Sequence, residues 1–205
     1  MNCNYLTVGY DCSPAAALRE LGMRDFALPF DWVTSNINAI QMCFETDFEL
    51  FHKNMTFTKN KTRLVDCYGF EFPHDYPLSD TRDVEKAGEG TFAESGKCIS
   101  DKWREYYSIV LEKYSRRIER FKRIINEPKP IIVLCRYSTK DVLKLQKIFM
   151  QCYKVKNMYF VNSSSEKFEN ENIQNVHTER NNVWNDAKVW KEGIDAMIKR
   201  IESKV

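Results

Sequence analysis

Short apolar runs of strand length recur along the chain, and segments with helical spacing of apolar residues separate most of them. The runs are YLTVGY at 5–10, RLVDCYGFEF at 63–72, PIIVLCRYS at 130–138, NMYFVNSSS at 157–165 and IQNVHTE at 173–179. Continuously apolar strands are buried on both faces, which is typical of parallel sheets covered by helices. The pattern predicts a three-layer α/β fold with a mostly parallel sheet flanked by helices, formed by residues 1–205 as a single domain.

The longest predicted helix covers residues 100–127. Its apolar residues repeat at three- and four-residue steps and define one face: Trp103, Tyr107, Val110, Leu111, Tyr114, Ile118, Phe121 and Ile125. Further helices are predicted at 35–52, 139–153 and 183–202. Residues 76–99 contain three glycines among charged turn clusters, which predicts a flexible loop.

The first strand leads through a sharp turn into a short helix at 13–21. Ser13 is the expected N-cap and Pro14 takes the first helical position, where its missing N–H costs nothing. Gly22 follows the helix where a C-cap glycine belongs.

Composition narrows the classes of protein that fit this pattern. Hydrophobic residues make up 43% of the 205 positions, which is too many for a disordered chain. The formal net charge is +2 and no block of lysines dominates, so no nucleic-acid or membrane-surface partner is expected. The apolar runs are too short to span a bilayer, and the N-terminus lacks the pattern of a signal peptide.

The seven cysteines favour a reducing compartment. Their number is odd, and they form neither a Cys-x-x-Cys pair nor the Cys/His spacing of a zinc site. The sequence also lacks Walker and GxGxxG loops. We therefore expect a cytoplasmic protein without a metal centre or a cofactor.

Cys12 is the first candidate for chemistry, because it stands between the first strand and the helix that begins near Ser13. Unpaired N–H groups at a helix N-terminus lower the pKa of a thiol and can hold an oxyanion. Cys12 is therefore either a nucleophile or a small core residue at this junction. In open α/β sheets, ligands bind beyond the carboxyl ends of the strands. The side chains that follow predicted strands are Cys12, His74, Arg136 and those of 163–165.

His74 lies between two prolines in GFEFPHDYP and is followed directly by Asp75. A restricted backbone suits a positioned general base, and the Asp75 carboxylate is a candidate to orient the imidazole. The alternative is a histidine that only belongs to a turn.

Four other charged residues are candidates for binding an anion or bracing the site: Arg24, Asp31, Arg117 and Arg136. Asp31 either pairs with Arg24 to brace its loop or faces a pocket. Arg117 lies about 60° from the centre of the apolar stripe of its helix. A semi-buried guanidinium needs an anion, either a carboxylate such as Asp31 or a substrate group. Arg136, at the end of a predicted strand, raises the same question.

Several segments together resemble an uncharacterised family, the putative papain-like cysteine peptidases, found in bacteria and large DNA viruses. The segments are TVGYDCSPAAALRELGMRDFALPFDW, GFEFPHDY, YSRRIERF and IIVLCR, within residues 5–136. The matching residues are Gly9, Cys12, Arg24, Pro29 to Trp32, His74, Asp75, Tyr114, Arg116 and Arg117. The resemblance implies a Cys12/His74 catalytic pair in the chain order of a papain-like enzyme. Papain packs a helix against an antiparallel barrel, whereas the strands here alternate with helices, so the α/β prediction is kept.

Three functions are compatible with these residues. The first is a cysteine hydrolase or acyl transferase in which Cys12 attacks the carbonyl of a peptide, ester, thioester or isopeptide and His74 is the base. The second is a Rossmann-like enzyme that modifies a glycan or uses a nucleotide sugar, with the arginines binding an anion and Cys12 structural. The third is a non-catalytic binding protein. The sequence does not predict which peptide, ester or glycan is the substrate, nor the oligomeric state.

Overall fold

The computed structural model describes residues 2–78, 98–176 and 187–204. The flexible loop predicted at 76–99 lies largely outside these residues. The last residues of the run at 173–179 and the first residues of the helix predicted at 183–202 also lie outside them.

A four-stranded parallel sheet forms the middle layer, with the strand order β1-β5-β6-β7. Its strands are β1 (Asn4–Thr7), β5 (Ile131–Cys135), β6 (Met158–Ser163) and β7 (Ile173–Val176). Each strand lies within one of the predicted apolar runs. Along β5, Val133 packs into one helical layer, whereas Ile132 and Leu134 pack into the other. This alternation explains why β5 is apolar throughout, and the predicted three-layer α/β fold is confirmed.

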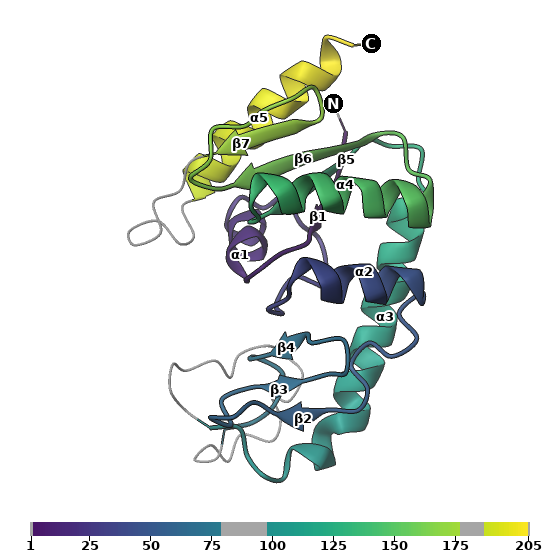
Figure 1. Ribbon diagram of the computed structural model, residues 1–205, viewed down its shortest axis with the longest axis vertical. Helices are drawn as coiled ribbons and strands as arrows, with labels where there is room; N and C mark the ends of the chain where they lie inside the picture. The colour runs from purple at the N-terminus through teal and green to yellow at the C-terminus, as the bar shows by residue number, and fades with distance from the viewer. Residues whose placement is uncertain (1, 79–97, 177–186, 205) are drawn as a thin grey trace.

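Helices cover both faces of the sheet (Figure 1). The helices are α1 (Ser13–Glu20), α2 (Ile37–Glu45), α3 (Tyr107–Ile125), α4 (Thr139–Tyr153) and α5 (Ala187–Glu202). α1 and α5 pack on one face, and α2, α3 and α4 pack on the other. α5 approaches the sheet closely at Gly193, where a Cβ atom would lie 2.8 Å from Cγ1 of Val161.

A second, small antiparallel sheet is formed by the chain between α2 and α3, with the order β2-β3-β4. Its strands are β2 (Thr56–Phe57), β3 (Leu64–Val65) and β4 (Glu71–Phe72). The prediction of one strand at 63–72 is wrong, because the chain turns back between β3 and β4. The turn is held by Asp66, whose Oδ1 accepts hydrogen bonds from the N–H groups of Tyr68, Gly69 and Phe70 at 2.9–3.0 Å.

An aromatic core and α3 connect the two sheets. Figure 1 shows α3 extending from the parallel sheet to the small sheet. Phe30 is buried at the centre of this core. Its ring centroid lies 5.6–5.8 Å from those of Phe44, Phe48, Phe51, Phe70 and Phe121. Because these rings come from α2, the following loop, the small sheet and α3, their packing fixes the small sheet against the rest of the fold.

Several helix boundaries differ from the prediction. Cys12, rather than Ser13, occupies the N-cap of α1, while Gly22 takes φ +63° just beyond the helix. α2 ends at Glu45, and left-handed residues such as Asp47 and Phe48 interrupt the pattern that predicted a helix to 52. The predicted helix at 100–127 begins with a 3₁₀ turn, Trp103–Tyr106, before α3. Among the described helices, none is long and apolar enough to cross a membrane.

Candidate active site

Cys12 lies at the carboxyl end of β1, where the chain enters α1. Its carbonyl accepts the first hydrogen bond of the helix, from the N–H of Ala16 at 3.0 Å. The neighbouring Asp11 carboxylate accepts the N–H of Ser13 at 3.0 Å, and Pro14 has no N–H to offer. Cys12 is only 6% exposed, so it is almost entirely shielded from solvent.

His74 is brought to Cys12 by the small sheet. Glu71 of β4 pairs with Thr34 through two backbone hydrogen bonds of 2.9 Å, which attaches the strand before His74 to the loop after Trp32. The Trp32 ring then meets the His74 imidazole edge-on, with centroids 6.0 Å apart. The result is a contact of 3.4 Å between Cys12 Sγ and His74 Nε2. This distance joins two residues that are 62 positions apart in the sequence.

Asp75 is fully buried and points to α3. Its carboxylate forms an ion pair with Lys113 and accepts a hydrogen bond of 2.8 Å from the Tyr114 hydroxyl. Burial alone would raise the pKa of Asp75, but the cations of Lys113 and Arg117 hold it below its usual value. Among the described residues, Asp75 therefore anchors the segment that carries His74, because its bonds lead to α3 and not to the imidazole.

Burial keeps both members of the Cys12/His74 pair neutral near pH 7. It raises the pKa of Cys12 to about 12, with a further rise from the Asp11 carboxylate. It also lowers the pKa of His74, although the Asp75 carboxylate opposes this. The lowered thiol pKa expected from the helix N-terminus is therefore wrong for the resting protein, because desolvation of a thiolate at this position outweighs the favourable charges.

Arg63 is a residue near the pair that the sequence did not reveal. Its Nη1 donates to Glu71 Oε2 at 2.6 Å and to Thr34 Oγ1 at 3.2 Å. Its charge lowers the pKa of both Cys12 and His74. No local pattern could have identified it, because the hairpin that brings Arg63 and Glu71 together was predicted to be one strand.

Two of the four charged candidates, Arg24 and Asp31, form an ion pair with each other, as one of the two alternatives for Asp31 predicted. Arg24 pairs with Asp31 at 2.5 Å, and Asp31 also accepts hydrogen bonds from Thr7 Oγ1 at 2.6 Å and from the N–H of Leu28 at 2.7 Å. Asp31 thus braces its loop against β1. The Arg24 guanidinium lies 5.4 Å from the ring centre of Trp32.

The other two predicted arginines differ in their partners. Arg136 Nη1 lies 2.6 Å from Asp11 Oδ2, which fixes the residue next to Cys12 to the end of β5. Arg117 does not meet Asp31. Its guanidinium carbon lies 5.3 Å from the ring centre of Tyr114, and its Nη1 is buried with no hydrogen-bond partner among the described residues.

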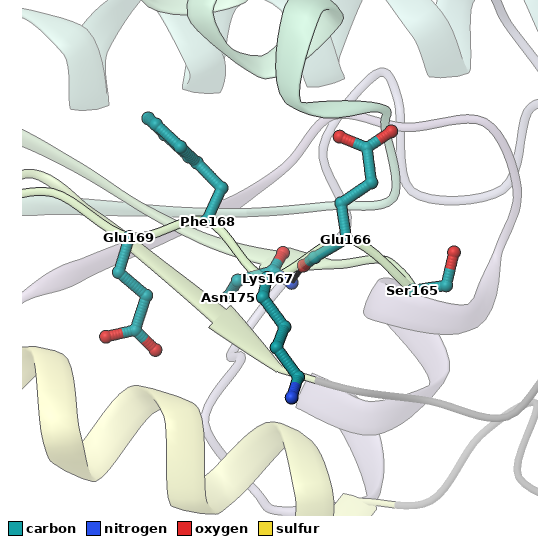
Figure 2. A pocket seen from close by; sticks show the side chains of 6 residues that line it. All are labelled: Ser165, Glu166, Lys167, Phe168, Glu169 and Asn175. Carbon is teal, nitrogen blue, oxygen red and sulfur yellow. Dashed lines mark hydrogen bonds between the residues drawn. The ribbon is translucent and has the colours of Figure 1, made fainter.

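A pocket of about 520 Å³ lies elsewhere, in the loop between β6 and β7 (Figure 2). It is lined by Ser165, Glu166, Lys167, Phe168, Glu169 and Asn175. Glu166 points to α4 and accepts the N–H of Thr139 at 2.8 Å. Glu169 points to α5, where Arg200 lies 3.5 Å away. The two carboxylates of this pocket therefore serve the packing of helices. Across residues 2–78, 98–176 and 187–204, no group of three His, Cys, Asp or Glu side chains is placed to hold a metal ion.

Comparison of the sequence with known protein families identifies the family of this chain. A family model described as putative papain-like cysteine peptidase matches residues 3–162, more than half of the chain. The chain belongs to this family. No curated protein and no solved structure matches it.

In this member of the putative papain-like cysteine peptidase family, the matched region extends from β1 to the end of β6 and includes both Cys12 and His74. The segments that carried the resemblance meet in the structure. Asp75 of the His-Asp pair bonds to Tyr114 of the Tyr-x-Arg-Arg segment. Arg117 of that segment adds its charge to the same buried group. The Tyr114 bond and the Arg117 charge therefore connect two of these segments next to the Cys12/His74 contact.

Proposed function

We propose that the protein is a cysteine hydrolase or acyl transferase that uses Cys12 as nucleophile and His74 as general base. The observation that carries this proposal is the 3.4 Å contact between Cys12 Sγ and His74 Nε2 at the start of α1. A nucleophile within hydrogen-bonding reach of a base is the arrangement that covalent catalysis requires.

Because both groups are neutral at rest, the proton moves during the attack. His74 Nε2 takes the thiol proton as Sγ bonds to the carbonyl carbon, and the electron pair of the C=O bond moves to oxygen. Because Cys12 is the N-cap of α1, we expect the positive end of this helix to stabilise the developing oxyanion. Collapse of the intermediate expels an amine, alcohol or thiol, which takes the proton from His74. Water or another acceptor then cleaves the thioester, with His74 again acting as base.

The other two functions receive less support. The glycan-modifying or nucleotide-sugar enzyme needs arginines that can reach a ligand, yet Arg24 and Arg136 are each paired with a carboxylate and Arg117 is only 7% exposed. A non-catalytic binding protein would have no need of a thiol and an imidazole in contact.

We propose that Asp75 positions His74, because its carboxylate binds Lys113 and Tyr114 of α3.

The test is the pH dependence of alkylation by iodoacetamide, followed residue by residue by mass spectrometry. If His74 is the base, the rate at Cys12 is constant between about pH 7 and 9, because the imidazole is already neutral and the thiol still protonated. The exposed Cys67 serves as internal control, because alkylation of a solvent-exposed thiol without a base partner should become faster as the pH rises.

The variant His74→Ala is expected to slow Cys12 alkylation by on the order of 100-fold at pH 7.5 and to leave Cys67 unchanged. A Cys12 rate that keeps the same pH dependence and magnitude in this variant would contradict the proposed role of His74.

A further inference from the structure

A polar pocket of about 640 Å³ lies on the β2–β3 hairpin and on β4. It is lined by Thr58, Lys59, Asn60, Thr62, Arg63 and Glu71. Its volume is within the range of ligand sites, although such sites usually have apolar walls. Because every lining residue here is polar or charged, the pocket suits a hydrophilic ligand.

Arg63 connects this pocket to the Cys12/His74 pair. Its Nη1 bonds to Thr34 and Glu71, which are themselves a bridged backbone pair. Two residues before Thr34 and three residues after Glu71 come the rings of Trp32 and His74, which are in contact. The Thr34–Glu71 pair that Arg63 binds therefore connects it to the segments that carry Trp32 and His74, and the charge of Arg63 acts on both His74 and Cys12.

The groups of the pocket that remain free are hydrogen-bond donors. The Asn60 carbonyl oxygen accepts the hydroxyl groups of Thr58 at 2.9 Å and Thr62 at 2.8 Å, which leaves the amide NH₂ as donor. Arg63 uses only Nη1, and Lys59 has no carboxylate partner among the described residues. Glu71 is neutralised by Arg63, so the pocket keeps one excess positive charge.

We infer that this pocket binds the acidic side chain of a peptide substrate whose scissile carbonyl lies at Cys12. This inference rests on the proposed function and narrows its substrate to peptides with a carboxylate near the cleaved bond. The planar guanidinium of Arg63 uses Nη1 for the Glu71 carboxylate and Thr34, and its Nε and Nη2 carry three further N–H groups that can bind a second carboxylate. The Lys59 ammonium and the Asn60 amide provide the remaining donors.

The first experiment measures binding without catalysis, in the Cys12→Ala protein. Fluorescein-labelled tetraglutamate and tetraglutamine peptides are compared by fluorescence anisotropy at low ionic strength. We expect tetraglutamate to bind more tightly than tetraglutamine. Adding Arg63→Gln weakens tetraglutamate binding by on the order of tenfold, the effect of a lost hydrogen bond between charged groups. Adding Lys59→Gln weakens it by roughly threefold, the effect of one exposed charge.

Lys61→Gln is the matched control. Lys61 lies on the same turn but pairs with Asp101 at 3.3 Å and does not line the pocket. Lys61→Gln removes one positive charge, as Lys59→Gln does. Because Lys61 lies outside the pocket, its loss should leave tetraglutamate binding unchanged. If tetraglutamate binds no better than tetraglutamine, or if Lys61→Gln weakens binding as much as Lys59→Gln does, the inference is overturned. Within residues 2–78, 98–176 and 187–204 the Lys59 side chain makes no hydrogen bond or ion pair, so this comparison stands even if Arg63→Gln is unstable.

The second experiment separates this inference from the proposed function. In the protein with Cys12 intact, the rates of alkylation by iodoacetate and iodoacetamide are compared, since these reagents differ in one carboxylate. We expect the iodoacetate rate divided by the iodoacetamide rate to fall several-fold in Arg63→Gln and to remain constant in Lys61→Gln. If the iodoacetamide rate depends on His74 but the ratio is unchanged in Arg63→Gln, the pocket is refuted and the Cys12/His74 pair is retained. If tetraglutamate binding depends on Lys59 but Cys12 does not react, only the role of the Cys12/His74 pair is refuted.

Discussion

The ion pair of Asp75 with Lys113 offers the most direct test of how the fold positions His74. The variant Asp75→Asn keeps the shape of the side chain but removes the anion between Lys113 and Arg117. Both cations are less than 10% exposed, so they would remain buried without a counter-charge. Removing one partner of a buried pair costs about 3–5 kcal/mol of folding stability. The hydrogen bond from Tyr114 is weakened in the same variant, which keeps the expected loss near the upper end.

The measurement is urea unfolding at 25 °C and pH 7, followed by tryptophan fluorescence. A second variant, Asp75→Asn with Lys113→Met, removes the uncompensated ammonium and should recover at least half of the lost stability. The pH dependence has a definite sign. Because the pKa of Asp75 is lowered in the folded protein, its contribution is present above about pH 4 and is lost as the pH falls through the folded value.

The same variants distinguish two roles of Asp75. If the carboxylate acts by anchoring its segment to α3, the double variant should recover stability and His74-dependent alkylation of Cys12 together. If the carboxylate acts on the imidazole itself, stability returns while the alkylation rate stays low. A loss of less than about 1 kcal/mol in Asp75→Asn, the range of an exposed pair, would refute the assignment of this ion pair as a buried anchor.

Two further predictions concern packing and acid sensitivity. Gly193→Ala should destabilise the protein by about 1–3 kcal/mol in urea unfolding, because its Cβ meets the Cγ1 atoms of Val161 and Val176. The control is Gly22→Ala, since Gly22 has φ +63° and open space around it. This control should cost about 1–2 kcal/mol through backbone strain alone and leave the packing of α5 unchanged. His52 is fully buried, and burial lowers its pKa from 6.5 to about 4. The neutral form therefore stabilises the fold above pH 6.5, and about 3 kcal/mol should be lost as the pH falls from 6.5 to 4. An equal acid sensitivity in His52→Gln would contradict this assignment.

The layers of the fold could be predicted from the sequence because they follow from local periodicity. The run at 131–135 is apolar at every position, and it became the fully buried β5. Gly22 was identified as a helix end because its left-handed conformation is a property of one residue. The strand at 63–72 was predicted wrongly, because the chain makes a turn at Asp66. The Asp66 carboxylate accepts hydrogen bonds from three successive N–H groups, which therefore do not pair with a neighbouring strand.

The site was less predictable, since its properties depend on contacts between distant segments. Cys12 and His74 were candidates from their positions after strands, and the structure places them in contact. The resting pKa of Cys12 followed from how completely the folded chain buries it, and burial of this kind cannot be predicted from a local pattern. Lys113 was not recognised because it lies on the polar side of a helix in the sequence, and its partner Asp75 is 38 positions away.

The burial of Cys12 also bears on how the protein survives oxidants. Peroxides and disulfides react with the thiolate form of cysteine, so a thiol that keeps its proton at pH 7 is a poor target. With only 6% of the residue exposed, Cys12 also offers little surface to a reagent in solution. In the proposed mechanism, Cys12 becomes nucleophilic only while a substrate carbonyl is in place, so the resting thiol stays in the form that reacts slowly with oxidants.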